Sequence, residues 1–289
     1  LLNYTKKKDV KSNLIVEGVV NKNNSVFLNK INFAESKNLI KIKNINLNSK
    51  KKLKRIDQID IDLVNNNDQI SQLNIKRKKS NYSINSKIFD GTKILDRILF
   101  SKSDGNFFDV FEKLNSKITI NFNTIYITNE DYLTNFKADM IVNNNQIKDL
   151  ILSSRFATKE DLKLSIKTNS NNERITDLFA GNAKPLVKKY DFIKGFEGGY
   201  LKFDSIEKNK VSNSNLKIFD FKLKEVPALT KLLTLASLQG IADLLTGEGI
   251  RFNEFEMIFN NKDGLMTIEE IYSLGPSISI LMDGYIQKD

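Results

Sequence analysis

Apolar and polar residues alternate with a period of two over most of the chain, a pattern typical of half-buried β-strands. Residues 59–63 place Ile59, Ile61 and Leu63 on one face, and residues 117–122 repeat the pattern. Similar patterns predict further strands at 136–142, 147–156, 162–167, 200–206, 216–223, 252–259, 265–272 and 278–286. The chain therefore reads as a series of short strands.

The alternation changes phase inside two of these segments. Ile40 and Ile42 give way to Ile45 and Leu47, and the same one-residue shift occurs within residues 118–127. Because a one-residue slip moves every later side chain to the opposite face, each shift predicts a bulge or a crossing between environments.

The segments between the strands are rich in Asn and Gly, as at 65–68, 142–146 and 260–264. These residues tolerate turn geometry, so we expect consecutive strands to form antiparallel hairpins. Helical patterns are few and short: residues 90–100, 172–181 and 185–190. The expected class is mainly β, a long, curved, twisted antiparallel sheet (a taco-like β-groove) with a few short helices.

The stretch "EVPALTKLLTLASLQGIADLLTGEGIRF" at 225–252 departs from this pattern. It is too short and too polar for a membrane span, because Lys231 and Asp243 would each cost about 2.5–3.5 kcal/mol at the centre. Its polar face carries Thr and Ser with a single Lys, which also disfavours a membrane-surface helix. Two apolar stripes lie on nearly opposite sides of one helix axis: Leu229, Leu232, Leu233 and Ala236, then Leu238, Ile241, Ala242 and Leu245. A kink near 237–240 would bring both onto one surface, so we predict a kinked helix pair at about 227–246 that caps one end of the groove.

The composition argues against an enzyme. Cys and His are absent, which removes disulfides, thiolate nucleophiles, the usual zinc ligands and imidazole catalysis. The glycine-rich segments 195–199 and 246–249 do not match a phosphate-binding spacing, and the carboxylates at 129–131, Asp243 and Glu248 are too few to suggest a metal site. We predict no catalytic residue, no metal and no cofactor.

A net charge of +10 at first suggests a polyanionic partner. The basic runs lie at 6–8, 50–55 and 76–79, and no stacking aromatic residues lie among them. A solvated basic surface therefore explains them better than nucleic-acid binding, and we predict no nucleic-acid partner. Binding to a polyanion would instead require strongly salt-dependent affinity.

The chain begins "LLNYTKKKDV", without Met and without a signal-peptide pattern, and reads as a segment of a longer protein. Residues 225–286 contain a characteristic series of Pro, Gly and apolar residues: Pro227, Ala228, Leu232, Leu233, Gly240, Leu245, Gly247, Gly249, Ile250, Phe252, Asp263, Gly264, Gly275, Pro276 and Gly284. At these residues the segment resembles the C-terminal region of AsmA-like envelope proteins, in particular the YhdP-like branch (AsmA/YhdP/TamB) of alphaproteobacteria. Weaker matches upstream, such as "FDGTKILDRIL", extend the resemblance to about residue 87.

The resemblance implies a division into residues 1–86, a β segment that continues the same sheet, and residues 87–289, the AsmA-like region. The latter would hold helices at about 91–100, 173–190 and 227–246 and final hairpins at 250–287, in one elongated domain. The resemblance further implies a periplasmic location, with the parent protein anchored in the inner membrane of a Gram-negative bacterium through an N-terminal helix outside this sequence.

The implied role is non-enzymatic: transfer of phospholipid between inner and outer membranes, or maintenance of the envelope. Carrying an acyl chain of ~16 carbons through water costs on the order of 10 kcal/mol, so a carrier needs a continuous apolar lining. Candidate lipid-facing residues are Ile118, Ile120, Phe122, Phe136, Ala138, Met140, Val142, Ile278, Ile280 and Met282. Ordinary sheet core packed against helices is the alternative for each of them. The alternative for the whole chain is a structural or adaptor β-domain that binds envelope proteins along its exposed edges.

Overall fold

The computed structural model describes residues 4–64, 70–92, 108–190, 195–224, 249–276 and 278–287. The described strands form one open sheet of sixteen strands in sequence order, from β1 to β16. The predicted mainly-β class is thereby confirmed. Contacts divide the chain into two compact units, residues 1–157 and 158–289. The predicted division between residues 86 and 87 falls inside a strand of the first unit and stays a prediction.

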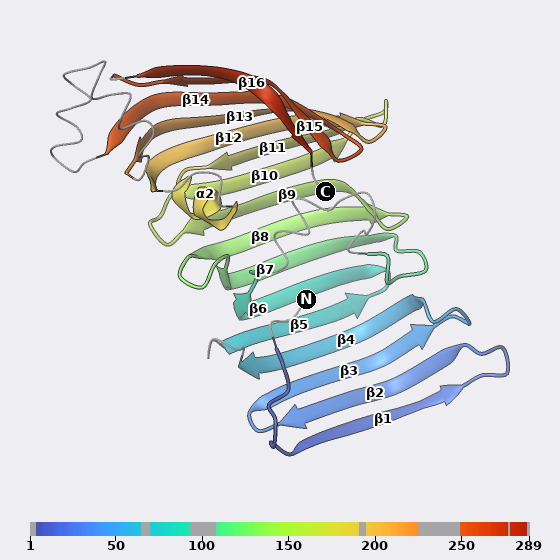
Figure 1. The fold of residues 1–289 in the computed structure, drawn as a ribbon. Helices are drawn as coiled ribbons and strands as arrows, with labels where there is room; N and C mark the ends of the chain where they lie inside the picture. Colours follow the sequence, from blue (N-terminus) through green and yellow to red (C-terminus); the bar gives the residue numbers. More distant parts are fainter. Residues whose placement is uncertain are drawn as a thin grey trace. The chain divides into compact units, whose positions relative to one another are not determined.

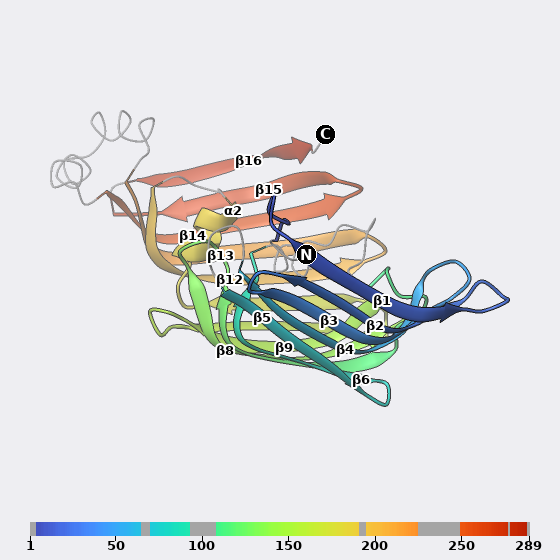
Figure 2. The same cartoon turned by 90° about the horizontal axis from the view of Figure 1, so that it is seen from below.

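The first unit contains nine strands, which lie side by side in Figures 1 and 2. Their bounds are β1 Ser12–Val20, β2 Val26–Glu35, β3 Asn38–Leu47, β4 Leu53–Val64, β5 Ile70–Lys78, β6 Asn81–Asp90, β7 Ser116–Tyr126, β8 Tyr132–Asn143 and β9 Gln146–Phe156. The second unit contains β10 Asp161–Thr168, β11 Arg174–Ala180, α2 Lys184–Tyr190, β12 Phe196–Lys208, β13 Val211–Leu223, β14 Ile250–Lys262, β15 Leu265–Leu274 and β16 Ser279–Gln287. Every strand expected from the alternation is present.

Antiparallel pairing between consecutive strands is confirmed at all but one of the described pairs within the units. β6 and β7 are parallel, with Tyr82 opposite Ile118 and Phe89 opposite Ile125. The hairpin expectation is wrong here because residues 91–115 separate the two strands, and a connection of that length permits a crossover. The helix predicted at 90–100 falls almost entirely among residues 93–107, which are outside the described residues. The capping pair predicted at 227–246 also lies outside the described residues.

The helix predicted at 172–181 is wrong, since Arg174–Ala180 form the strand β11. The apolar spacing of Ile175, Leu178 and Phe179 suits a helical turn. The segment pairs instead with β10 on one side and β12 on the other over its whole length. Two complete ladders outweigh the weak helical preference of so short a segment. The helical turn expected at 185–190 is confirmed as α2, which packs against β12.

The predicted phase shifts correspond to interruptions that neighbouring strands share. In β3 the left-handed residue Asn44, with φ 54°, lies outside the pairing with both β2 and β4. Ile56 and Ile61 of β4 are consequently both buried although five residues apart. β7 and β8 skip Asn123 and Asn135 together, and β12 and β13 skip Gly199 and Asp220. At each interruption, adjacent strands skip residues that lie opposite one another, so their alternation of buried and exposed residues reverses together. The buried face therefore continues from one strand to the next.

Replacing Asn44 with Val is expected to lower the free energy of unfolding by about 1–2 kcal/mol, because a β-branched residue is strained at positive φ. Asn44→Gly is the matched control: it removes the same side chain but accepts this φ, so the loss should stay within about 0.5 kcal/mol. Urea unfolding followed by circular dichroism measures both. Equal losses for the two variants would show that the side chain, not the backbone conformation, matters at this position.

Candidate functional site

The predicted lining residues of β7 and β8 lie opposite one another on one face of the first unit. Ile118 pairs with Met140, Ile120 with Ala138, and Phe122 with Phe136. All of these except Ile120 are buried, as is Val142, and Ile120 is half-buried. The intervening residues of the same strands, such as Lys117, Lys137 and Asp139, are exposed. The two strands therefore present one apolar and one polar face, as expected from the alternation.

The apolar face extends to the strands on either side. Leu150, Leu152 and Phe156 of β9 are buried next to β8, and Phe89 of β6 is buried next to β7. The ring of Phe122 lies 5.2 Å from that of Phe89 and 5.7 Å from that of Phe136, measured between centroids. Three strands thus contribute to one aromatic row, in which offset contacts add to the stabilisation from burial.

Residues 108–115, which we call the end strap, form hydrogen bonds both to β4 and to the turn between β8 and β9. Leu53 of β4 donates its backbone N–H to Val110 and accepts one from Glu112. At the other end, the Asn145 side chain accepts from the N–H of Leu114 (2.6 Å) and donates to the carbonyl of Phe111 (3.1 Å). Phe108 and Leu114 are buried. The strap thus links β4 to the β8–β9 turn within the first unit. The alternation of apolar residues did not predict this link.

The second unit has an apolar face of its own. The buried residues are Leu164 and Ile166 of β10, Ala180 of β11, Leu201 of β12, and Leu216 and Ile218 of β13. The rings of Phe196, Phe221 and Phe252, from β12, β13 and β14, stack with centroid separations of 5.1 and 5.2 Å. Leu186 and Val187 of α2 are also buried, as is Ala183 directly before it. The aromatic stack and α2, which contacts β12, therefore fill this part of the second unit with side chains.

The predicted lining residues in β16 and directly before it lie in a different environment. Ile278 and Ile280 are half-buried, and Met282 is 52% exposed. Leu281, on the other face, is 71% exposed, and β16 pairs with β15 as the last strand in the described strand order. These residues therefore do not form a buried row. The eight candidate capping residues of 229–245 lie outside the described residues.

The outward face of the second unit carries charged residues on four neighbouring strands, β11 to β14. Lys217 lies 2.9 Å from Glu256, and its hydrogen bond holds the pKa of the Glu256 carboxyl below its usual value. Asp204 lies directly opposite Asp177 in the pairing of β12 with β11. Burial, and then the neighbouring Asp177, raise the pKa of Asp204. Among the described residues no group of three or more Asp or Glu is placed to hold a metal ion.

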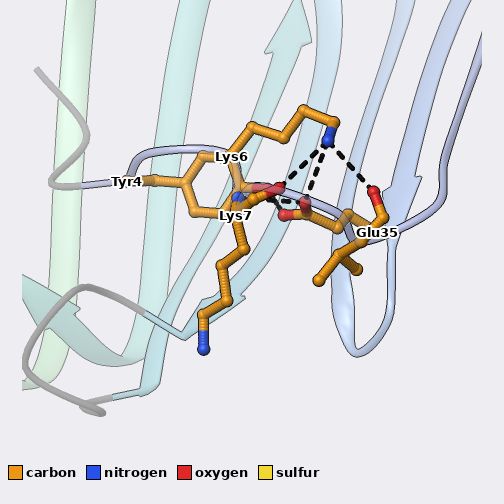
Figure 3. A network of polar contacts seen from close by, with 5 residues as sticks. Tyr4, Lys6, Lys7 and Glu35 are labelled. Atoms are coloured by element: carbon orange, nitrogen blue, oxygen red, sulfur yellow. Dashed lines mark hydrogen bonds and ion pairs between the residues drawn. The ribbon is translucent and has the colours of Figure 1, made fainter.

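A second polar network lies at the N-terminal side of the first unit (Figure 3). Glu35 at the end of β2 is 1% exposed. It accepts hydrogen bonds from the Tyr4 hydroxyl and from the Lys7 backbone N–H, and the Lys6 ammonium lies 3.8 Å away. Burial and the adjacent carboxylate raise the pKa of Tyr4 to about 12. The network holds residues 4–7 against the end of β2.

Several residues of the basic runs have local partners. Lys52 donates to the carbonyl of Asp109, and Arg55 and Arg77 both pair with Asp57. These contacts favour the interpretation of the runs as part of a solvated surface.

No helix among the described residues is long and apolar enough to cross a membrane. No protein-family profile matches the chain, and no curated protein or solved structure matches it significantly.

Proposed function

We propose that the chain is a non-enzymatic lipid-binding segment, in which the apolar face of the first unit accommodates phospholipid acyl chains. The observation that carries the proposal is the continuity of that face: buried apolar residues occupy corresponding positions on β6, β7, β8 and β9. Hydrocarbon transfer needs such a surface and no reactive group.

The resemblance to AsmA-like envelope proteins supports the same role. It adds a periplasmic location, a parent protein anchored in the inner membrane, and movement of phospholipid towards the outer membrane. Within the first unit, the end strap covers part of this face, since the ring of Phe111 lies 6.4 Å from that of Tyr82, which pairs with Ile118. An acyl chain must also displace or extend beyond contacts such as that between Phe122 and Phe136. Lipid binding therefore competes with the contacts that side chains of the apolar face make with one another.

Photocrosslinking in cells tests the proposal. A photoreactive residue at Ile120 or Met140 is expected to capture phospholipid, because both side chains belong to the apolar face. Ile141 and Ile151 are the matched controls, since they are apolar but 48% and 60% exposed on the opposite face. Protein adducts alone from Ile120 and Met140, or equal lipid capture at all four positions, would contradict the proposal.

A second candidate function is an adaptor that binds envelope proteins along an open strand edge. The observation that favours it is β16, where Leu281 and Tyr285 are 71% and 75% exposed on a strand that pairs, among the described strands, with β15 alone. Strand edges bind extended peptides through main-chain hydrogen bonds. Protein adducts from a photoreactive residue at Leu281, without lipid adducts from Ile120, would support this function over the first.

A further inference from the structure

The apolar face of the second unit changes from apolar to polar along the length of its strands. We describe it in rows, each made of residues that lie opposite one another from β10 to β14. Two adjacent rows are wholly apolar: Leu162, Ala180, Leu201, Ile218 and Phe255, then Leu164, Leu178, Phe203, Leu216 and Met257. Leu178, Phe203 and Met257 are only half-buried, so a ligand can reach this part of the face.

The next row introduces hydroxyl groups. Thr176 lies opposite Ser205, which lies opposite Ser214, between Ile166 at one end of the row and Phe259 at the other. Ser205 and Ser214 are buried, and their Oγ atoms lie 2.8 Å apart. This hydrogen bond uses one of the two serine protons, and Thr176 adds a third hydroxyl. The row therefore offers hydrogen-bond donors directly beside an apolar surface.

The last row before the turns contains a cation and a carboxylate. Its members are Thr168, Arg174, Glu207, Ser212 and Asn261. Nη1 of Arg174 lies 3.3 Å from Oε2 of Glu207, and the two side chains are 30% and 43% exposed. Nε of Arg174 is buried and has no hydrogen-bond partner among the described residues.

An unpaired buried N–H costs free energy, so this guanidinium lacks an acceptor. The single hydrogen bond to Glu207 is long, and it leaves the guanidinium able to turn towards an incoming oxygen atom. A phosphate group supplies such oxygens in the geometry that a guanidinium binds best. The carboxylate beside Arg174 in turn complements an ammonium group.

We propose that this face binds a zwitterionic phospholipid. Its acyl chains lie on the apolar rows, its glycerol esters meet the hydroxyl row, its phosphate binds Arg174 and its ammonium group binds Glu207. The order of these rows along the strands is the order of the same groups along the lipid. The inference rests on the proposed lipid-binding function and adds to it a second binding face and a class of headgroup.

A comparison of two lipids with the same pyrene-labelled chains, phosphatidylethanolamine and diacylglycerol, tests the phosphate site. Each is offered to the purified 289-residue chain from dodecyl maltoside micelles, and binding is followed by fluorescence. Phosphatidylethanolamine should bind about 10-fold more tightly or better, because only it forms charged hydrogen bonds with Arg174. Arg174→Gln should remove this difference. Arg251→Gln is the matched control, since Arg251 is exposed on the opposite face of β14 and its loss should leave the difference intact.

Phosphatidylglycerol with the same chains tests the carboxylate, because it has a phosphate but no ammonium group. It should bind about 3-fold more weakly than phosphatidylethanolamine, and Glu207→Gln should remove this preference. Circular dichroism verifies that all three variants are folded.

Equal affinity for phosphatidylethanolamine and diacylglycerol, or a difference that persists in Arg174→Gln, would overturn the headgroup site while the lipid-binding function stands. A preference over phosphatidylglycerol that is missing, or that persists in Glu207→Gln, would overturn it as well. Displacement of the lipid by an equal concentration of free phosphoethanolamine would contradict a role for the apolar rows. If none of the three lipids binds, the headgroup site and the proposed function both fail.

Discussion

Replacing Phe136 with Ala is expected to lower the free energy of unfolding by about 3–5 kcal/mol. The side chain is 3% exposed, and its ring lies 5.7 Å from that of Phe122 on the neighbouring strand. Truncation removes this contact and leaves a cavity in the middle of the aromatic row that also includes Phe89. Urea unfolding followed by circular dichroism measures the loss.

Ile141→Ala is the matched control for this substitution. Ile141 lies on the same strand but on the opposite face and is 48% exposed, so its truncation should cost less than about 1 kcal/mol. The difference between the two variants measures how strongly the chain depends on the apolar face of the first unit. Similar losses at both positions would mean that the two faces of β8 contribute equally, contrary to the burial pattern.

Replacing Tyr4 with Phe is expected to lower the free energy of unfolding by about 1–3 kcal/mol, because the buried Glu35 carboxylate loses a hydrogen-bond donor. Tyr285→Phe is the control, since Tyr285 is 75% exposed and its hydroxyl should contribute little. Both substitutions remove one hydroxyl, so urea unfolding compares them directly. A loss no larger than that of Tyr285→Phe would show that Tyr4 does not stabilise Glu35.

The same network makes a prediction about alkaline pH. The Tyr4 pKa is raised from 10.0 to about 12 in the folded chain, so its protonated form is favoured there. The stabilisation is fully present below pH 10 and is lost as the pH rises from 10 to 12, where the unfolded chain releases this proton first. Absorbance of tyrosinate should therefore show a group titrating near pH 12 that is missing in Tyr4→Phe. Its persistence in that variant would assign the late titration to another tyrosine, such as Tyr82, whose pKa burial also raises.

The alternation of apolar residues predicted most of the sheet because it reports directly on burial. Ile118, Phe122, Phe136 and Met140 were placed on one face by a period of two, and the structure pairs them across β7 and β8. The phase shift at Asn44 was also visible in the sequence. Its alignment with interruptions in neighbouring strands was not, because alignment depends on register and not on any single segment.

Other features depended on contacts distant in the sequence. β11 has a helical spacing, and only its two neighbouring strands make it extended. β1 lacks alternation because both of its faces are apolar, so the pattern did not identify it as a strand. The end strap was missed because its anchors, Leu53 and Asn145, lie on either side of it in the sequence and carry no periodic signal.

The end strap also constrains the order in which the chain can fold during synthesis. β1 to β5 can form their hairpins as soon as each strand leaves the ribosome, since every pairing among them is local. The strap can bond to Leu53 at once, but its second anchor does not exist until Asn145 has been translated. The N-terminal strands of the first unit can therefore pair first, and the strap can gain its second anchor only after the β8–β9 hairpin closes. A ribosome stalled before residue 145 would hold a nascent chain with the strap attached at one end only.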